Sequence, residues 1–354
     1  MGDKMDVLVK NILNKLEKNG YESYIIGGYP RDYLLGIESH DYDICTSATP
    51  DDLKNLFDDI ISSNYGSTKI RYNDSIFEIT TFRKESGYSD FRRPVLVEFV
   101  KDLKTDLMRR DFTINTICMN KDGNIIDVLN ARKDLNDKII KVVGDVETKI
   151  KEDSLRILRA IRFATVLNFK LADDLYRAID KHGYLVKHIS YERRKEELDK
   201  IFNCENVLYG VKLLRNLHLD EYLDINLENI KPFSAIGIWC QLNNNDYKFT
   251  KMERNIIDKV NELINLDILD NYNLYKYGLS ISLIAGKIKG IDENIIIKKY
   301  NELPIKSKKD IEIKDLYSNK IVEEIEKCIL NNALKNNKND ILKYLDVHKI
   351  DGNN

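Results

Sequence analysis

The sequence predicts an α+β protein in which a mixed β-sheet with flanking helices comes first and helices alone follow. Three observations lead to this prediction. Short runs with the two-residue period of strands alternate with helical runs up to about residue 145. From about residue 147 onward, apolar residues recur at helical spacing. The length of 354 residues suits two or three domains, and the predicted divisions are residues 1–145, 146–210 and 211–354.

The first part is predicted to open with a helix and to continue with strands. Apolar residues recur at helical spacing between residues 7 and 16, and Gly20 stands where such a helix ends. Thr49 followed by Pro50 is typical of a second helix start. A turn that enters a short helix is predicted at residues 27–36, and strands are predicted at residues 21–26, 41–45, 68–72, 76–82 and 95–100.

The remainder is predicted to be helical throughout. Residues 146–169 read as one long amphipathic helix, and three further helices are expected at 171–183, 189–202 and 205–217. Residues 225–354 are rich in Asn, Lys and Ile and mostly helical in pattern, with a break at Pro304.

Composition excludes several classes of protein. Lys and Arg number 56 against 58 Asp and Glu, so the net charge of −2 excludes a chain-wide basic coat for nucleic acid but not a local basic face. The five cysteines are widely separated and never form a CxxC pair, which indicates a reducing compartment and no zinc knuckle. No run of about 18 apolar residues is present, so we expect a cytoplasmic protein that does not span a membrane.

Two carboxylates lie two residues apart in the strand predicted at residues 41–45. Asp41 and Asp43 therefore face the same side, and paired carboxylates suit Mg²⁺, which takes oxygen ligands and bridges substrate phosphates. Glu78 supplies a third ligand, or a base for an attacking hydroxyl, if its strand neighbours this one. The alternative is that these residues are solvated side chains on exposed strand edges.

Two glycines and an arginine precede these carboxylates. A strand that runs into Gly27 and Gly28 and then into a helix leaves backbone N–H groups at the helix start, where anions bind. Arg31 adds a charge-assisted contact to phosphate, although a surface turn with Arg31 paired to Asp32 is the alternative. A phosphate-binding turn shortly before a metal-binding strand indicates a magnesium nucleoside triphosphate.

Two further segments are rich in arginine. Arg109 and Arg110 precede Asp111 and Asn115, which together offer phosphate and ribose contacts or, alternatively, N-capping by Asp111 or Thr113.

The second of these segments lies in the long predicted helix. Asp153, Arg156, Arg159 and Arg162 follow one another at intervals of three residues. Asp153 and Arg156 are then close neighbours, whereas Arg162 lies half a turn around the helix from Asp153. On helix periodicity alone, a solvated charged face is the alternative.

These motifs occur in one order and at spacings that resemble a known family. The segments that carry the resemblance are GGYPRDYLLG, DYD, FEITTFR, FRRP, RRDFTIN, EDSLRILRAIRFA and ERRKEEL. Together they resemble the class II tRNA nucleotidyltransferase/poly(A) polymerase family over about residues 20–205, and most of all its bacterial CCA-adding members. The resemblance implies a polymerase-β-like nucleotidyltransferase head at 1–145, a helical neck with a nucleotide-base site at 146–210, and a helical body and tail at 211–354 that binds tRNA.

The family's functional residues carry over position by position. The resemblance implies that Asp41 and Asp43 hold a two-metal Mg²⁺ site, and that Gly28 and Arg31 bind the nucleotide. It places the next motif's arginine at Arg110, beside a ribose-contacting Asp111. The base-selecting pair falls on Asp153 and Arg156, and Arg159 and Arg162 are further arginines of the nucleotide site. The sequence departs from the family's GGxVRD pattern by having Pro30 at the valine position.

The implied activity is template-independent addition of C, C and A to tRNA 3′ ends from CTP and ATP. Cytosine and adenine both present an amino donor beside a ring-nitrogen acceptor; a carboxylate only accepts and a guanidinium only donates, so Asp153 and Arg156 suit both bases and mismatch uracil and guanine. Residues 85–94 are expected to form the flexible loop that CC-only relatives lack. A-only enzymes, CC-only enzymes and bacterial poly(A) polymerases remain alternatives, as does an RNA-binding relative that has lost catalysis.

Overall fold

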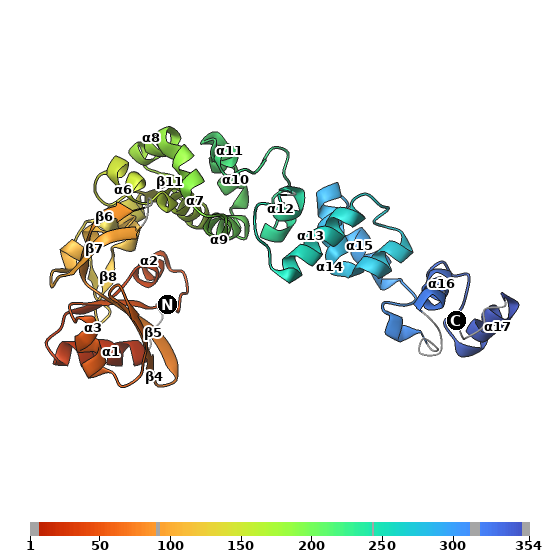
Figure 1. Ribbon diagram of the computed structural model, residues 1–354, viewed down its shortest axis with the longest axis horizontal. Coiled ribbons are helices and arrows are strands. Elements are labelled where there is room, and N and C mark those ends of the chain that lie inside the picture. Colours follow the sequence, from red (N-terminus) through yellow and green to blue (C-terminus); the bar gives the residue numbers. More distant parts are fainter. Residues whose placement is uncertain (1–6, 90–92, 243, 312–318, 349–354) are drawn as a thin grey trace. The chain divides into compact units, whose positions relative to one another are not determined.

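The computed structural model describes residues 7–89, 93–242, 244–311 and 319–348 (Figure 1). The chain divides into two compact units, Met1–Asn226 and Leu227–Asn354. The first holds a mixed sheet followed by helices, and the described part of the second is helical, so the predicted α+β class is confirmed. The finer divisions at residues 145 and 210 stay predictions. Among the described residues, no helix is both long and apolar enough to cross a membrane.

The central sheet of the first unit has seven strands in the order β3-β4-β5-β2-β1-β8-β9. Strands β2 and β5 are parallel, whereas the other neighbouring pairs are antiparallel, so the sheet is mixed, as predicted. The sequence analysis did not predict β3, whose residues alternate poorly. The strands are β1 (Ser23–Ile26), β2 (Asp43–Thr46), β3 (Ile60–Asn64), β4 (Ser67–Tyr72), β5 (Ser75–Thr81), β8 (Cys118–Met119) and β9 (Ile125–Ile126).

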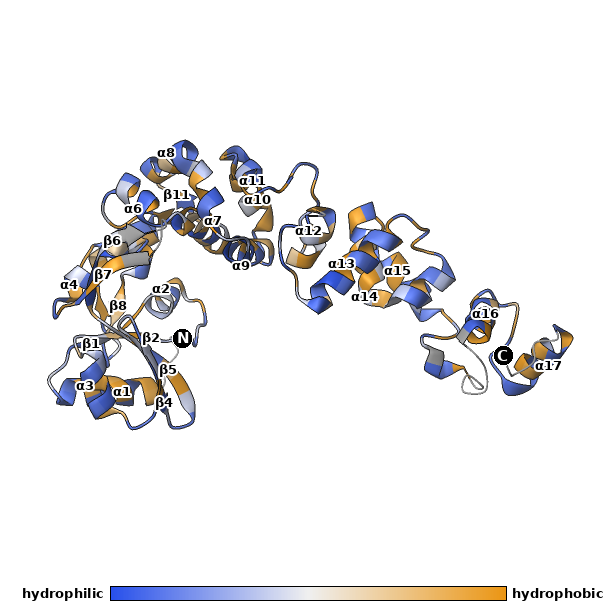
Figure 2. Ribbon diagram, viewed as in Figure 1, coloured by the Kyte–Doolittle hydropathy of each residue, from blue (hydrophilic) through white to orange (hydrophobic). Residues whose placement is uncertain are grey.

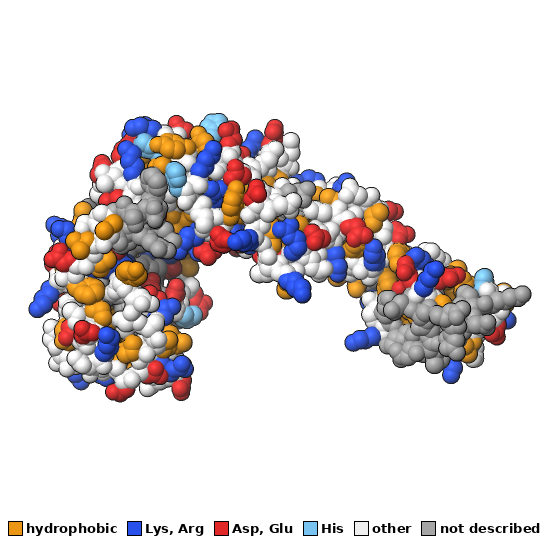
Figure 3. All heavy atoms as spheres, in the orientation of Figure 1, with side chains coloured by type: hydrophobic (Ala, Val, Ile, Leu, Met, Phe, Trp, Pro, Cys, Tyr) orange, Lys and Arg blue, Asp and Glu red, His pale blue; other side chains and the backbone are white. Residues whose placement is uncertain are grey.

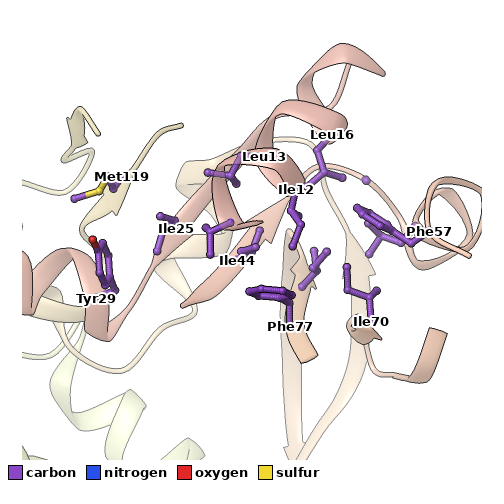
Figure 4. Close-up of a cluster of buried hydrophobic side chains, with 14 residues drawn as sticks. Ile12, Leu13, Leu16, Ile25, Tyr29, Ile44, Phe57, Ile70, Phe77 and Met119 are labelled. Carbon is purple, nitrogen blue, oxygen red and sulfur yellow. The ribbon is translucent and has the colours of Figure 1, made fainter. Parts of the chain in front are cut away.

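Apolar side chains cover both faces of this sheet. Successive residues of a strand point to opposite faces, so Ile25 and Ile44 join one cluster while Ile26 and Cys45 join another. Figure 4 shows the first cluster, in which α1 (Val7–Lys18) presents its buried side chains to β1, β2 and β5. The second cluster includes buried side chains of α4 (Leu103–Met108). The core therefore fixes which side of β2 each residue faces.

Short helices connect the strands. Thr49 caps α3 (Pro50–Leu56) through the backbone N–H of Asp52, and the Asp52 carboxylate accepts the N–H of Thr49 in return, as the predicted helix start requires. The other short helices are α2 (Gly28–Leu35), η1 (Thr113–Asn115) and α5 (Ala131–Asn136).

Residues 85–94, which were predicted to be a loop, lie largely in an antiparallel hairpin. Its strands are β6 (Arg83–Ser89) and β7 (Arg93–Phe99), and Tyr88 is paired with Pro94. The prediction failed because strand β6, with Lys, Glu, Ser and Gly, has little apolar alternation. The tip, residues 90–92, lies outside the described residues.

The single long helix predicted at residues 146–169 is also wrong. The chain forms α6 (Val146–Glu152), breaks at Asp153, which is extended at φ −144° and ψ 100°, and restarts as α7 (Leu155–Leu167). The Asp153 carboxylate accepts the backbone N–H of Leu155, which is the local bond by which Asp competes with helix continuation. The elements that follow are β11 (Lys170–Leu171), which pairs with β10 (Ile139–Ile140), then α8 (Asp173–His182), η2 (Gly183–His188), α9 (Tyr191–Phe202), α10 (Val207–Asn216) and α11 (Leu219–Tyr222).

The second unit consists of helices in its described part. Figure 2 shows apolar and polar bands side by side along them, as expected for amphipathic helices. Trp239 lies against Tyr247 and Phe249 in its core, and Pro304 follows a helix end, as predicted. The helices are α12 (Ala235–Leu242), α13 (Lys251–Leu263), α14 (Asn271–Lys289), α15 (Glu293–Asn301), η3 (Lys308–Asp310), α16 (Asn319–Leu330) and α17 (Lys338–Val347).

Candidate active site

Three carboxylates lie on the neighbouring strands β2 and β5 and just before them. Asp43 is the first residue of β2, and Asp41 precedes that strand by two residues. Asp43 lies directly opposite Glu78 in the parallel register of β2 with β5, so the strands are neighbours, as the sequence analysis required. Asp41, however, lies just outside the strand that was predicted to contain it.

The Glu78 carboxylate is held by the next strand. Its Oε1 accepts a hydrogen bond from the Oγ of Ser67 at 2.5 Å, and its Oε2 lies 3.7 Å from the Nζ of Lys69. Both partners belong to β4. Glu78 is therefore anchored by β4, which adjoins β5 on the side opposite β2.

Asp43 lies in an electrostatic environment that suits a cation. Loss of solvent raises the pKa of its carboxyl group, and the negative charge of Asp41 raises it further; Arg110 opposes these effects and Glu78 adds to them. Gly27, at φ 86°, packs beside this group, because a Cβ there would lie 3.3 Å from the Oδ2 of Asp43. Glycine therefore leaves room for the carboxylate at the start of α2.

Helix α2 begins with Gly28, directly after this turn. Pro30 stands in its first turn, where a backbone N–H has no intrahelical acceptor, so the missing N–H costs no hydrogen bond. The departure from the family pattern at this position is thus compatible with the helix start.

Arg31 connects α2 to a distant segment. Its Nε and Nη2 each lie 2.8 Å from the Oδ1 of Asp32, and its Nη1 donates to the Oδ1 of Asn115 at 2.8 Å. The alternative interpretation was a surface turn in which Arg31 pairs with Asp32. The pair is present, but Arg31 is buried rather than a surface residue.

Asp111 joins that segment to α7. Its Oδ2 accepts from the Nε of Arg159 at 2.8 Å and from Nη2 at 2.5 Å, while its Oδ1 accepts the Nδ2 of Asn115 at 3.3 Å. Burial alone would raise the pKa of Asp111, but the charge of Arg159 and the hydrogen bonds to the carboxylate keep it below its usual range. Arg31, Asn115, Asp111 and Arg159 thus form one continuous polar chain.

Arg110 lies at the end of α4 with its guanidinium held by Asp106, a fully buried carboxylate. The Nη2 of Arg110 lies 3.2 Å from one oxygen of Asp106, and Arg109 approaches the other oxygen at 2.8 Å. Arg109 also reaches Glu85 of the β6–β7 hairpin, at 3.2 Å. The arginine that lowers the pKa of Asp43 is therefore linked to the base of the hairpin.

Arg156 and Asp153 lie at the break between α6 and α7. The Nη1 of Arg156 donates to the carbonyl oxygen of Lys149 at 2.6 Å and lies 3.2 Å from an oxygen of Glu152. Arg156 is buried, so the last turn of α6 fixes its guanidinium. The alternative of a solvated charged face therefore does not hold for Arg156.

Arg162 has a carboxylate partner in another helix, α9. Its Nε lies 2.9 Å from the Oε2 of Glu197 in α9, although the two are not aligned for a hydrogen bond. Burial lowers the pKa of the Arg162 guanidinium, Glu197 opposes this, and the neighbouring charge of Arg159 lowers it further. The guanidinium of Arg162 also lies over the ring of Phe163, 4.3 Å from its centroid.

Three residues of this region were not among the predicted site residues. Asp106, Glu197 and Phe163 each contact at least one arginine of the predicted set. A signal existed for Asp106, which precedes Arg110 by four residues on a helix, where opposite charges meet. Glu197 gives no such signal, because its contact with Arg162 joins two helices. Phe163 shares α7 with Arg159 and Arg162, and only its contact with Arg31 joins segments far apart in the sequence.

The described residues contain no group of three or more His, Cys, Asp or Glu arranged to hold a metal ion. Mg²⁺, however, is commonly held by one or two carboxylates together with substrate phosphates. The crowded carboxylates of Asp41 and Asp43 and the room left by Gly27 fit that pattern.

Two family models match the chain. The poly A polymerase head domain matches residues 23–141, and the model described as "Probable RNA and SrmB- binding site of polymerase A" matches residues 168–225. A CCA-adding enzyme of Staphylococcus haemolyticus is 33% identical, with 98% of each chain covered. The chain belongs to the CCA-adding enzyme family. A CCA-adding enzyme of Ligilactobacillus salivarius is 36% identical, over 86% of this chain and 85% of that one.

Solved structures of CCA-adding enzymes share the fold. The Bacillus stearothermophilus CCA-adding enzyme in complex with CTP matches with a TM-score of 0.81 and 25% identity, covering 98% of both chains. The Thermotoga maritima CCA-adding enzyme complexed with tRNA matches with a TM-score of 0.70 at 19% identity, which shows the same fold. As a member of this family, the chain is a tRNA nucleotidyltransferase.

Proposed function

We propose that this CCA-adding enzyme builds C, C and A onto the 3′ end of tRNA from CTP and ATP, with release of diphosphate and without a nucleic-acid template. The observation that carries the proposal is the single polar chain Arg31–Asn115–Asp111–Arg159, which ties the start of α2 to α7, the helix that contains Arg156. The near full-length similarity to CCA-adding enzymes supports it.

Asp153 and Arg156 are proposed to read the base. Arg156 is held by the Lys149 carbonyl, so it offers its remaining N–H groups as donors in a fixed direction. Asp153 lies in the break between α6 and α7, so its carboxylate does not belong to the surface of either helix. A donor toward the ring nitrogen and an acceptor toward the amino group admit cytosine and adenine and mismatch uracil and guanine.

The arginines are proposed to bind the rest of the nucleotide. The start of α2 offers the backbone N–H of Gly28 and the guanidinium of Arg31 to phosphate. Arg110, Arg159 and Arg162 add positive charge, and Asp111 and Asn115 face the ribose. Because each arginine already has a carboxylate or amide partner, its direction is set before the nucleotide binds.

Asp41 and Asp43 are proposed to hold Mg²⁺, with Glu78 as a third carboxylate nearby. The bound ions supply charge neutralisation of the phosphates and activation of the attacking 3′ hydroxyl. A readout independent of turnover is the melting temperature: Mg²⁺ is expected to raise the melting temperature of the wild type, because it relieves carboxylate repulsion. Asp43→Asn should lose this shift; an equal shift in the variant would remove Asp43 from the metal site.

The deciding experiment supplies tRNA that lacks CCA, together with Mg²⁺ and labelled CTP or ATP. The product lengths separate the alternatives: three added nucleotides with both substrates indicate CCA addition, two indicate a CC-adding enzyme, and one A on a tRNA ending in CC indicates an A-adding enzyme. A long A tail indicates a poly(A) polymerase, and no incorporation indicates a non-catalytic relative. The β6–β7 hairpin favours competence for the final A, because CC-only relatives are expected to lack this segment.

tRNA is the proposed nucleic-acid substrate. Figure 3 shows Lys and Arg interspersed with Asp and Glu over the face in view, rather than one large basic field. We therefore expect the helical residues 211–354 to grip the tRNA backbone through individual cationic side chains.

A further inference from the structure

The ring of Phe163 is surrounded by guanidinium groups from two parts of the fold. The guanidinium of Arg162 lies 4.3 Å from the ring centroid, and those of Arg159 and Arg31 each lie 5.5 Å from it. Arg31 belongs to α2, whereas the other two belong to α7. All three distances fall within the range, about 6 Å, at which the negative face of an aromatic ring attracts a cation.

The ring is not needed to neutralise these charges. Arg31 is paired with Asp32, Arg159 with Asp111 and Arg162 with Glu197. Three positive charges that converge on one ring still repel one another. What the ring adds is a common position for three side chains that come from two separate helices.

Phe163 is itself held in place. Its ring meets the ring of Phe112 edge to face, with centroids 5.6 Å apart and an interplanar angle of 74°. Phe112 is fully buried, and its backbone N–H donates to Asp111 at 2.8 Å. The ring is thus fixed against the same segment that orients Arg159.

We propose that Phe163 is a positioning residue for nucleotide binding, whose ring holds Arg31, Arg159 and Arg162 so that they converge on the triphosphate and sugar. The inference rests on the proposed function, because it takes those arginines to be nucleotide ligands. Phe163 acts through the arginines and does not contact the nucleotide. Phe163 therefore strengthens nucleotide binding equally in the ground state and in the transition state.

The test replaces the ring and separates binding from turnover. Phe163→Leu keeps an apolar side chain but removes the aromatic face. The KM for CTP and for ATP should rise about tenfold, with kcat within about twofold of the wild type, because uniform binding is lost. Phe163→Tyr retains the ring and should keep the KM within about threefold of the wild-type value.

A matched control and an independent readout accompany these variants. Phe57 is a buried ring with Lys15 at 4.8 Å, remote in the fold from the arginine set, so Phe57→Leu should lower the melting temperature and leave the KM unchanged. Calorimetric binding of CTP without tRNA should weaken about tenfold in Phe163→Leu, in step with KM. If Phe163→Leu does not fold, Phe163→Met, which fills irregular space, takes its place.

The outcomes distinguish this inference from the proposed function. A wild type that binds CTP but adds nothing to tRNA contradicts the proposed function, while the calorimetric comparison still decides the role of Phe163. Wild-type CTP affinity in the Leu or Met variant overturns the inference. So does equal weakening in Phe163→Leu and Phe163→Tyr, or a fall in kcat and melting temperature at constant KM, since each of these indicates packing alone.

Discussion

The carboxyl group of Asp43 has a raised pKa and lies beside two other carboxylates. A bound cation relieves the repulsion among their negative charges. Asp41→Ala and Asp43→Ala should each lower incorporation of both CTP and ATP by at least about 10³-fold, because charge on the transferring phosphate is no longer neutralised. Single-turnover incorporation on tRNA lacking CCA measures this. Asp51→Ala, an exposed carboxylate paired with Lys54, is the control and should remain active. A near-normal rate in either alanine variant would exclude the replaced aspartate from the metal site.

The base-reading pair can be tested by reversal. Asp153→Arg with Arg156→Asp places a donor where the amino group points and an acceptor where the ring nitrogen points. Low absolute activity is expected, because a carboxylate at position 156 has no N–H group to donate to the Lys149 carbonyl. The ratio of UTP or GTP use to CTP or ATP use should nevertheless rise by more than about tenfold, because each mismatched contact is worth about 1–3 kcal/mol. Competition assays with paired nucleotides measure this ratio, and an unchanged preference would remove the pair from base reading.

Individual site residues were predictable from motif order, but most of their contacts were not. Asp111 and Arg159 are 48 residues apart, and Arg31 and Asn115 are 84 apart, so no local periodicity reveals either contact. The register of Asp43 with Glu78 was inferred conditionally, because which strands are neighbours depends on the whole sheet. Phe163 belongs to the motif EDSLRILRAIRFA, but the sequence predicts no role for it, since an apolar ring in an amphipathic helix is typical of a core residue.

Among the elements, the β6–β7 hairpin is proposed to be needed for addition of the final A. Replacing residues 89–93 by Asn-Gly would close the strands with a two-residue turn beyond the Tyr88–Pro94 pair. Addition of the final A should fall by more than about tenfold while CC addition stays within about threefold, because the longer hairpin is expected to reshape the base site for the larger purine. Gel analysis of tRNA ending in CC and of tRNA lacking CCA reports the two steps separately. Equal loss at all three additions would make the hairpin a general support.

The contact between α6 and α8 gives a pH-dependent expectation. Hydrogen bonds from Lys181 and His182 lower the pKa of Glu147 from 4.5 to about 2. Since the folded-state value is depressed, ionised Glu147 stabilises the fold above about pH 4.5, and that contribution is lost as the pH falls toward 2. The melting-temperature difference between the wild type and Glu147→Gln should therefore shrink between pH 6 and pH 3. Asp258→Asn, at an exposed position of α13, is the control, and a difference that is constant with pH would contradict the assignment.

Element boundaries were predictable where capping chemistry is explicit and not where side chains compete with the backbone. Thr49 and Pro50 correctly marked the start of α3. The break at Asp153 was missed because apolar residues keep their helical spacing on both sides of it, while the Asp153 carboxylate bonds locally to Leu155. Strand β6 was missed because its polar residues lack a two-residue pattern.

At the scale of the whole chain, the near-neutral net charge makes tRNA binding depend on local cations. Raising monovalent salt from 50 to 200 mM should raise the KM for tRNA by roughly tenfold, because bound cationic groups release counterions from the phosphates. The KM for CTP should change less, since the arginines proposed to bind CTP are largely buried. Salt therefore screens their charges less. Steady-state assays at fixed Mg²⁺ measure both, and a tRNA KM that does not respond to salt would exclude a backbone-gripping surface.

The order of the strands and arginines along the chain has a consequence for biosynthesis. The last strand of the central sheet, β9, ends at Ile126, whereas Arg156, Arg159 and Arg162 come later and Glu197, the partner of Arg162, later still. Because a nascent chain emerges from its N-terminus and folds in that order, the carboxylate-bearing sheet is complete while the helices that carry these later arginines and Glu197 are still being translated. Ribosome-bound fragments that end between these points would carry a folded carboxylate-bearing sheet without the proposed base-reading residue Arg156, so we expect activity only after these helices have been made.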